Sequence, residues 1–131
     1  MVGRGGTYSR SPSSSARSGS WPLSGGSQPY GPTSLYSKQA GATYSYTVDL
    51  PVAGEYEVFL WWSGYPSRPP SVAVEIHTAT FATTRWVDQR SNAGQWNSVF
   101  NFTLAATVTI KLISPGNGSA CADAVRFVRK I

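Results

Sequence analysis

The sequence predicts an all-β protein, an antiparallel jelly-roll-type β-sandwich with a polar, extended N-terminal tail. Apolar and polar residues alternate over several segments of strand length, and Gly and Pro residues occur in the turns between these segments. In no segment do the apolar residues recur with the period of a helix. Strands with one apolar and one polar face are typical of antiparallel sheets, and two such sheets packed on their apolar faces form a sandwich. The 131 residues suffice for one hydrophobic core.

The beginning of the chain differs from the rest in composition. Residues 1–34 contain 21 Gly, Ser or Pro residues, a composition that buries little apolar surface. We therefore predict that residues 1–20 form an extended Gly/Ser/Arg-rich tail and that residues 21–131 form the β-sandwich domain. Within the first part of the tail, only Val2 and Tyr8 offer side chains that could fill a pocket.

Two strands with strict alternation flank a turn predicted at residues 50–54, where Pro51 and Gly54 lie. In segments 43–50 and 55–62 every second residue is apolar, which places one face of each strand in the core. The predicted core positions are Tyr44, Tyr46, Val48, Leu50, Tyr56, Val58, Leu60 and Trp62.

Further strands follow the proline-containing loop 63–70. The alternation predicts strands at 72–76, 83–87, 96–104 and 107–113, a tight turn at 115–118, and a last strand that begins near Val125. We expect Trp96, Phe100, Phe102 and Leu104 to share a core face, and Trp21 and Trp62 to lie in the core as well.

Five short patterns occur in a defined order along the chain. They are Gly19-Ser20-Trp21, the run Gly54–Val58 leading to Trp61-Trp62, Val87–Arg90, Gly94–Trp96 and Ala122–Phe127. In order and spacing, residues 18–129 resemble the golvesin C-terminal domain, a carbohydrate-binding-like module also attached to xanthan lyases.

The resemblance implies a non-catalytic jelly-roll sandwich on a secreted or surface protein, and therefore an extracellular or cell-surface location. It also implies that the motif residues are structural, with Asp88 and Asp123 in buried or half-buried charge-assisted bonds that pin loops beside Arg90 and Arg126. The motif residues are Asp88, Gln89, Arg90, Gly94, Gln95, Trp96, Asp123 and Arg126.

The chain departs from the family pattern at residues 3–18. Family members open with an apolar strand, whereas this segment is rich in Ser, Gly and Arg. We therefore expect the first strand to be weakened, displaced or missing. A sandwich that lacks a strand exposes unpaired backbone groups, which can accept a strand from another chain.

Composition and charge exclude several classes of function. The net charge is +5, but Arg4, Arg10 and Arg17 lie in the tail, so the folded part lacks the basic stripe of a nucleic-acid-binding protein. No apolar run is long enough for membrane insertion. One cysteine, Cys121, and one histidine, His77, predict neither a metal site nor a disulfide, and we expect no cofactor.

The sequence also argues against an enzyme. Hydrolysis of a glycoside requires two carboxylates that face each other across a cleft. Glu55 and Glu57 are neighbours on one strand face rather than opposed, and His77 has no second histidine to complete a metal site.

Exposed aromatic side chains are the candidates for a binding surface. Sugars stack their apolar faces on such rings, and a protein interface uses them too. The three best candidates are Trp61 on the face opposite the core, Tyr65 on a proline-containing loop and Trp86 on a short strand. Asn101 and Asn117 lie in glycosylation sequons and are possible acceptors.

Two functional hypotheses follow. The first is a self-assembling fibre or surface-layer subunit whose tail docks on a neighbouring copy, so that its partners are other copies of itself. The alternative is a carbohydrate-binding module of a secreted or surface protein, with glycans as partners.

Overall fold

The structure is a computed structural model that describes residues 7–10 and 15–130. Within them it contains nine strands and no helix, so no helix of the described residues could cross a membrane. The strands are β1 (Thr7–Arg10), β2 (Ala16–Ser18), β3 (Leu35–Ser37), β4 (Thr43–Trp61), β5 (Val72–His77), β6 (Ala82–Val87), β7 (Trp96–Ile113), β8 (Ala120–Ala122) and β9 (Ala124–Arg129).

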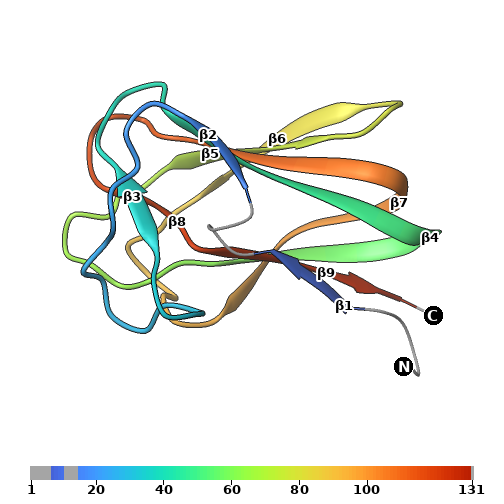
Figure 1. Cartoon of the computed structure of the whole chain (residues 1–131), viewed down its shortest axis with the longest axis horizontal. Helices are drawn as coiled ribbons and strands as arrows, with labels where there is room; N and C mark the ends of the chain where they lie inside the picture. The colour runs from blue at the N-terminus through green and yellow to red at the C-terminus, as the bar shows by residue number, and fades with distance from the viewer. Residues whose placement is uncertain (1–6, 11–14, 131) are drawn as a thin grey trace.

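Two antiparallel layers stack on each other, and the long strands β4 and β7 belong to both (Figure 1). The first half of β4 pairs with the second half of β7, from Thr43 opposite Ile113 to Leu50 opposite Ala106. The second half of β4 pairs with the first half of β7 in the other layer. The turn predicted at residues 50–54 is therefore a bend with a register shift inside one continuous strand.

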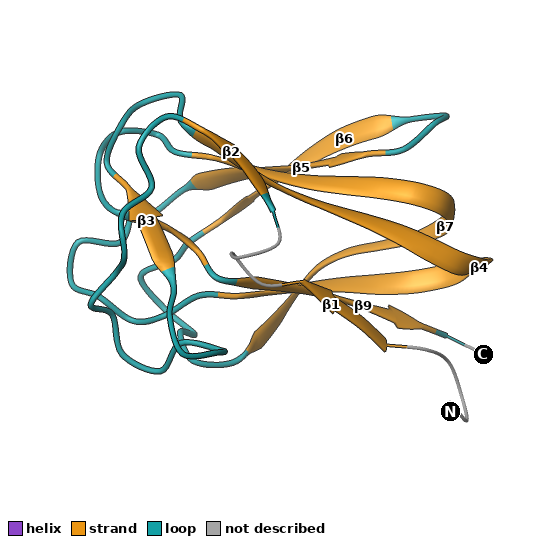
Figure 2. Cartoon of the chain, in the orientation of Figure 1, coloured by secondary structure: helices purple, strands orange, loops and turns teal. Residues whose placement is uncertain are grey.

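The remaining strands complete the two layers (Figure 2). The sheet order is β1-β9-β4-β7-β5-β6, with β2 paired to β4. Strands β5, β6 and β2 extend the layer that holds the first half of β4, and β9 and β1 extend the layer that holds its second half. The short pair β3–β8 closes the end of the sandwich at which most loops gather. An all-β antiparallel sandwich is thus confirmed.

The N-terminal segment contributes strands to its own chain. β1 pairs with β9, with Thr7 opposite Val128, and β2 pairs with β4, with Ser18 opposite Thr43. The edge at which we expected another chain to add a strand is therefore occupied by β1. Tyr8 lies opposite Phe127 in this pairing, whereas Val2 is outside the described residues.

The core has the alternation that the sequence predicts. Side chains at every second position of both halves of β4, and of β5, are buried because the pleat turns them toward the facing layer. Trp21 closes the loop end of this core, with its ring 5.3 Å from that of Tyr44. Burial confirms the predicted core positions Tyr44, Tyr46, Val48, Leu50, Tyr56, Val58, Leu60 and Trp62. In the predicted strand 72–76, Val72, Val74 and Ile76 are buried as well.

Trp96 departs from this pattern, and its predicted place in the core is wrong. Val58 lies opposite Phe100 but Phe59 lies opposite Ser98, so Val99 is an extra residue that forms a β-bulge. The bulge reverses the alternation along the start of β7, which brings Trp96 opposite Trp61 on the outer face.

Candidate functional site

The loops at one end of the sandwich enclose a small open pocket, here called the loop-end pocket. It lies where residues 23–25, β3, the loop 63–70 and the residue that precedes β8 meet, and its cavity volume is about 160 Å³. Its lining residues are Leu23, Ser24, Gly25, Tyr36, Lys38, Tyr65, Arg68 and Ser119.

Strand β3 supplies one wall of the pocket. It pairs with β8, and its alternation buries Leu35 and Ser37 while it turns Tyr36 outward. Lys38, two residues after Tyr36, is exposed at the same wall. A backbone hydrogen bond of 3.0 Å from Tyr36 N to Pro22 O holds the strand against the segment that precedes the pocket.

The floor of the pocket is the guanidinium of Arg68, a buried side chain with 4% of its surface exposed. Its Nε donates to the Ser63 carbonyl at 2.9 Å, Nη1 donates to the carbonyl and hydroxyl of Ser119, and Nη2 donates to the hydroxyls of Ser24 and Ser63. Arg68 therefore ties three separate segments of the chain together at the base of the pocket.

Arg68 carries a buried positive charge, and the oxygens that accept its hydrogen bonds are all neutral. No carboxylate lies within ion-pair distance of it among the described residues. Desolvation lowers the pKa of Arg68, but a guanidinium starts so far above neutrality that it stays charged. Its Cζ lies 5.7 Å from the ring centroid of Tyr65, whose residue surface is 49% exposed, and this cation–π contact orients the ring at the pocket mouth.

Asp123 is a buried carboxyl group on which the charge of Arg68 acts. Its Oδ2 accepts a hydrogen bond of 2.9 Å from the Tyr30 backbone N–H, while its Oδ1 has no partner in the structure. Burial raises the pKa of Asp123 to about 6, and the Tyr30 N–H and the charge of Arg68 partly oppose that rise. The expected partner Arg126 instead stacks on Trp96, with Cζ 5.4 Å from the ring centroid.

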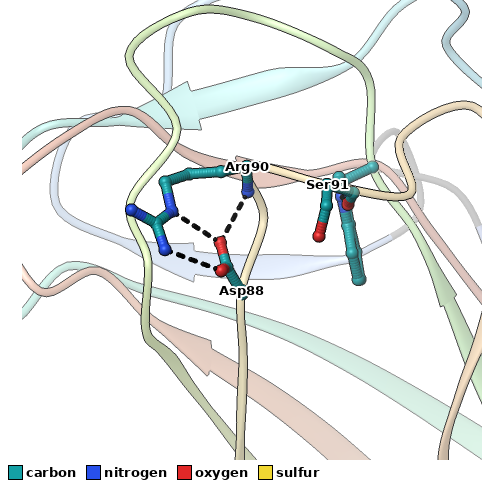
Figure 3. A network of polar contacts seen from close by, with 4 residues as sticks. Asp88, Arg90 and Ser91 are labelled. Carbon is teal, nitrogen blue, oxygen red and sulfur yellow. Dashed lines mark hydrogen bonds and ion pairs between the residues drawn. The ribbon is translucent and has the colours of Figure 1, made fainter.

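The Asp88–Arg90 pair forms the expected charge-assisted bonds, but on the surface (Figure 3). Asp88 Oδ1 accepts from the Arg90 backbone N–H and Nε, and Oδ2 accepts from Nη2 at 2.9 Å, which lowers the pKa of Asp88. Gln89 between them is buried and exchanges two hydrogen bonds with the backbone of Cys121. The buried side chain that fastens this loop to β8 is therefore Gln89, and not Asp88.

The Gly94–Trp96 motif fixes an aromatic cluster on the outer face of β4 and β7. Gly94 has φ +72° and donates its N–H to the Trp62 carbonyl, and the exposed Gln95 leads into Trp96. The Trp61 and Trp96 ring centroids are 5.4 Å apart, and Tyr30 lies against both rings. Because Trp61 Nε1 also donates to the Gln28 carbonyl, the cluster fastens loop 24–31 to the sheet.

The three aromatic candidates from the sequence lie at three different places. Trp61 belongs to the cluster just described, Tyr65 lies at the loop-end pocket, and Trp86 lies on β6, with 64% of its surface exposed. Sequence reasoning missed Tyr36, Lys38 and Arg68, since only the folding of β3 beside loop 63–70 brings them to Tyr65.

The remaining described residues that the sequence singles out do not line the loop-end pocket. Asn101 and Asn117 are both exposed, and their role as glycan acceptors stays a prediction. Cys121 is buried and free, and burial raises the pKa of its thiol. His77 Nε2 lies 2.7 Å from Glu75 Oε1 on the same strand. No group of three or more His, Cys, Asp or Glu side chains that could hold a metal ion occurs within residues 7–10 and 15–130.

Comparison with known proteins relates this sandwich to polysaccharide-active proteins. A xanthan lyase from Bacillus sp. (strain GL1) is 36% identical over 122 residues, which are 86% of this chain and 13% of the lyase. The structure of a Paenibacillus xanthan lyase superposes with a TM-score of 0.88 at 24% identity over 95% of this chain and 13% of that one. This chain thus spans a small fraction of the length of those enzymes.

An isolated module has the same fold. A family 35 carbohydrate binding module from Clostridium thermocellum superposes with a TM-score of 0.64 at 12% identity, covering 93% of this chain and 97% of the module. The family model described as Golvesin C-terminal domain matches residues 8–129. Together with the identity to the Bacillus enzyme, this match shows that the chain belongs to the golvesin C-terminal domain family.

Proposed function

We propose that this protein is a non-catalytic carbohydrate-binding module and that the loop-end pocket holds a sugar ring. The observation that carries the proposal is the pairing of Tyr36 and Tyr65 with polar groups around one cavity. Sugar rings present apolar C–H faces that stack on aromatic rings and hydroxyls that need hydrogen-bond partners. Ser24, Lys38 and Ser119 supply polar groups of that kind.

The size of the pocket suits a single saccharide unit. Its volume of about 160 Å³ is below the range of roughly 300–1,000 Å³ that is typical of pockets for larger ligands. Because the pocket is open at the loop end, a chain that enters it can continue into solvent. The geometry therefore favours recognition of one residue, terminal or within a chain, rather than of a long oligosaccharide.

The chemistry of the lining supports binding rather than hydrolysis. Its eight residues include no carboxylate, whereas glycoside hydrolysis requires an acid and a nucleophile or base on the two sides of the bond. The family and the likeness to a carbohydrate-binding module support the same proposal. An extracellular or cell-surface location, where polysaccharides occur, is part of this proposal.

The fibre hypothesis is not supported. Its premise was that the N-terminal segment leaves the domain to pair with a neighbouring copy. The strands β1 and β2 pair instead with β9 and β4 of the same chain, and the family match includes most of this segment. A carbohydrate-binding module is consistent with the likeness to known modules and does not require the N-terminal segment to leave its own domain.

Replacing Tyr65 with alanine should weaken glycan binding by about tenfold, because loss of a stacked ring costs on the order of 1 kcal/mol or more. The measurement is a glycan array that includes xanthan, followed by calorimetric titration of the best ligand. Trp86→Ala is the matched control, since it removes an exposed ring that lies on β6 and not at the pocket. The proposal fails if the wild type binds no glycan, or if Trp86→Ala abolishes binding while Tyr65→Ala does not.

A further inference from the structure

We infer that the saccharide recognised by the loop-end pocket is acidic, a sugar that carries a carboxylate. This inference rests on the proposed function and names the chemical class of its ligand. It comes from the charges that line the cavity and from the way in which Arg68 is held.

Both charged residues of the lining are cationic. Lys38 lies exposed at the wall and Arg68 lies buried at the floor, and the other six lining residues are uncharged. Two of the charged groups elsewhere in the described residues are paired locally, since Asp88 bonds to Arg90 and His77 has Glu75 beside it, whereas no carboxylate lines the pocket. A ligand entering the pocket therefore meets two positive charges and no negative one on its walls.

The guanidinium of Arg68 is fully hydrogen-bonded, but no carboxylate of the described residues forms an ion pair with it. Its acceptors are two backbone carbonyls and three serine hydroxyls, all of them neutral. The ionisable groups that influence it from the packed elements are Cys121, Asp123 and Tyr65, and none of them forms an ion pair with it. The hydrogen bond that Asp123 does form is with the Tyr30 backbone N–H, which donates to its Oδ2. A buried charge that forms no direct ion pair is costly, and an anionic ligand would reduce that cost.

The two cations have different roles. The donors of Arg68 are committed to Ser24, Ser63 and Ser119, so it acts on a ligand through its field, which burial strengthens. No hydrogen bond or ion pair to Lys38 is present among the described residues, and its ammonium offers three donors. We assign to Lys38 the direct contact with the carboxylate, while the sugar ring stacks on Tyr65.

The test compares charged polysaccharides with neutral forms of the same chains. Polygalacturonate, alginate and glucuronoxylan, each with its carboxyl-reduced derivative, are titrated into the wild type, with dextran sulfate as a polyanion that lacks carboxylates. We expect at least one uronate polymer to bind about tenfold more tightly than its reduced form, since a charge-assisted hydrogen bond is worth that much or more. Raising the salt from low to high concentration should remove most of the difference.

The matched variants are Lys38→Gln and Lys111→Gln. Both remove one positive charge, but Lys111 lies on β7, away from the loop-end pocket. Lys38→Gln should lose about tenfold in affinity for the uronate polymer and little for its reduced form, whereas Lys111→Gln should change neither.

The outcomes separate the inference from the proposed function. Equal binding of charged and reduced polymers would overturn the inference and leave carbohydrate binding standing. Absence of binding to every polymer and to the glycan array would overturn both. Binding of dextran sulfate as tight as that of the uronates, or equal losses in the two lysine variants, would reduce the effect to general charge attraction and overturn the carboxylate assignment.

Discussion

Arg68→Met should lower the free energy of unfolding by about 3–5 kcal/mol, because several buried oxygens lose their donor at once, and this is the largest effect that we expect from one polar substitution in this protein. Methionine fills much of the same space, but it cannot donate to the oxygens of Ser24, Ser63 and Ser119. These oxygens would be left without their donor, and each buried acceptor that loses its partner costs about 1–3 kcal/mol. Urea unfolding followed by circular dichroism measures the change.

Two controls isolate the role of the guanidinium. Arg68→Lys keeps the charge but not the planar fork, so it should cost less than methionine and still be clearly destabilising. Arg90→Met removes an arginine that bonds to Asp88 on the surface, and it should cost less than about 1 kcal/mol. A change below 1 kcal/mol in Arg68→Met would show that Arg68 does not hold the three segments together.

The second large effect is a dependence of stability on pH that arises from Asp123. Its pKa is raised from 3.8 to about 6 in the folded chain by burial, so between these values the folded state binds more protons than the unfolded state. The stabilisation from protonated Asp123 is fully present below pH 3.8 and is lost as the pH rises through 6. Because one pKa unit corresponds to about 1.4 kcal/mol, the loss is roughly 3 kcal/mol.

The variant Asp123→Asn reveals this contribution. Its amide oxygen can still accept the Tyr30 N–H, but it does not titrate. We expect the difference in unfolding free energy, variant minus wild type, to rise between pH 4 and pH 7 and then to level off. Asp88→Asn is the control, because the lowered pKa of the exposed Asp88 confines its change to lower pH. A difference for Asp123→Asn that stays constant with pH would contradict the assignment.

The fold could be predicted from the sequence wherever alternation is unbroken. In segments 43–50 and 55–61 of β4, and in β5, every second residue is apolar and buried. The prediction failed at Trp96 because the bulge at Val99 inserts one residue into the ladder, and the alternating pattern carries no mark of that insertion. It also missed β1, because the sequence Thr7–Arg10 lacks the alternation of apolar residues by which a strand is predicted.

The candidate site was harder to predict for a related reason. Tyr65 stands out as an aromatic residue on a loop, but its neighbours at the pocket come from distant parts of the chain. From the sequence, an arginine in a loop such as Arg68 is expected to be exposed to solvent. Its burial depends on serine hydroxyls and backbone carbonyls that only the folded loops bring together. Hydrogen-bond acceptors of this kind have no sequence signature.

The sharing of β4 and β7 between the two layers bears on how this domain comes apart. Neither layer has an independent central pair, because the same two long strands, β4 and β7, supply the middle of both. Loss of one sheet would break the strands that frame the other, so the domain should melt as one all-or-none unit without a half-folded intermediate. Pairing such distant residues as Thr43 and Ile113 also requires closure of a long loop, which should make refolding slow for a domain of this size.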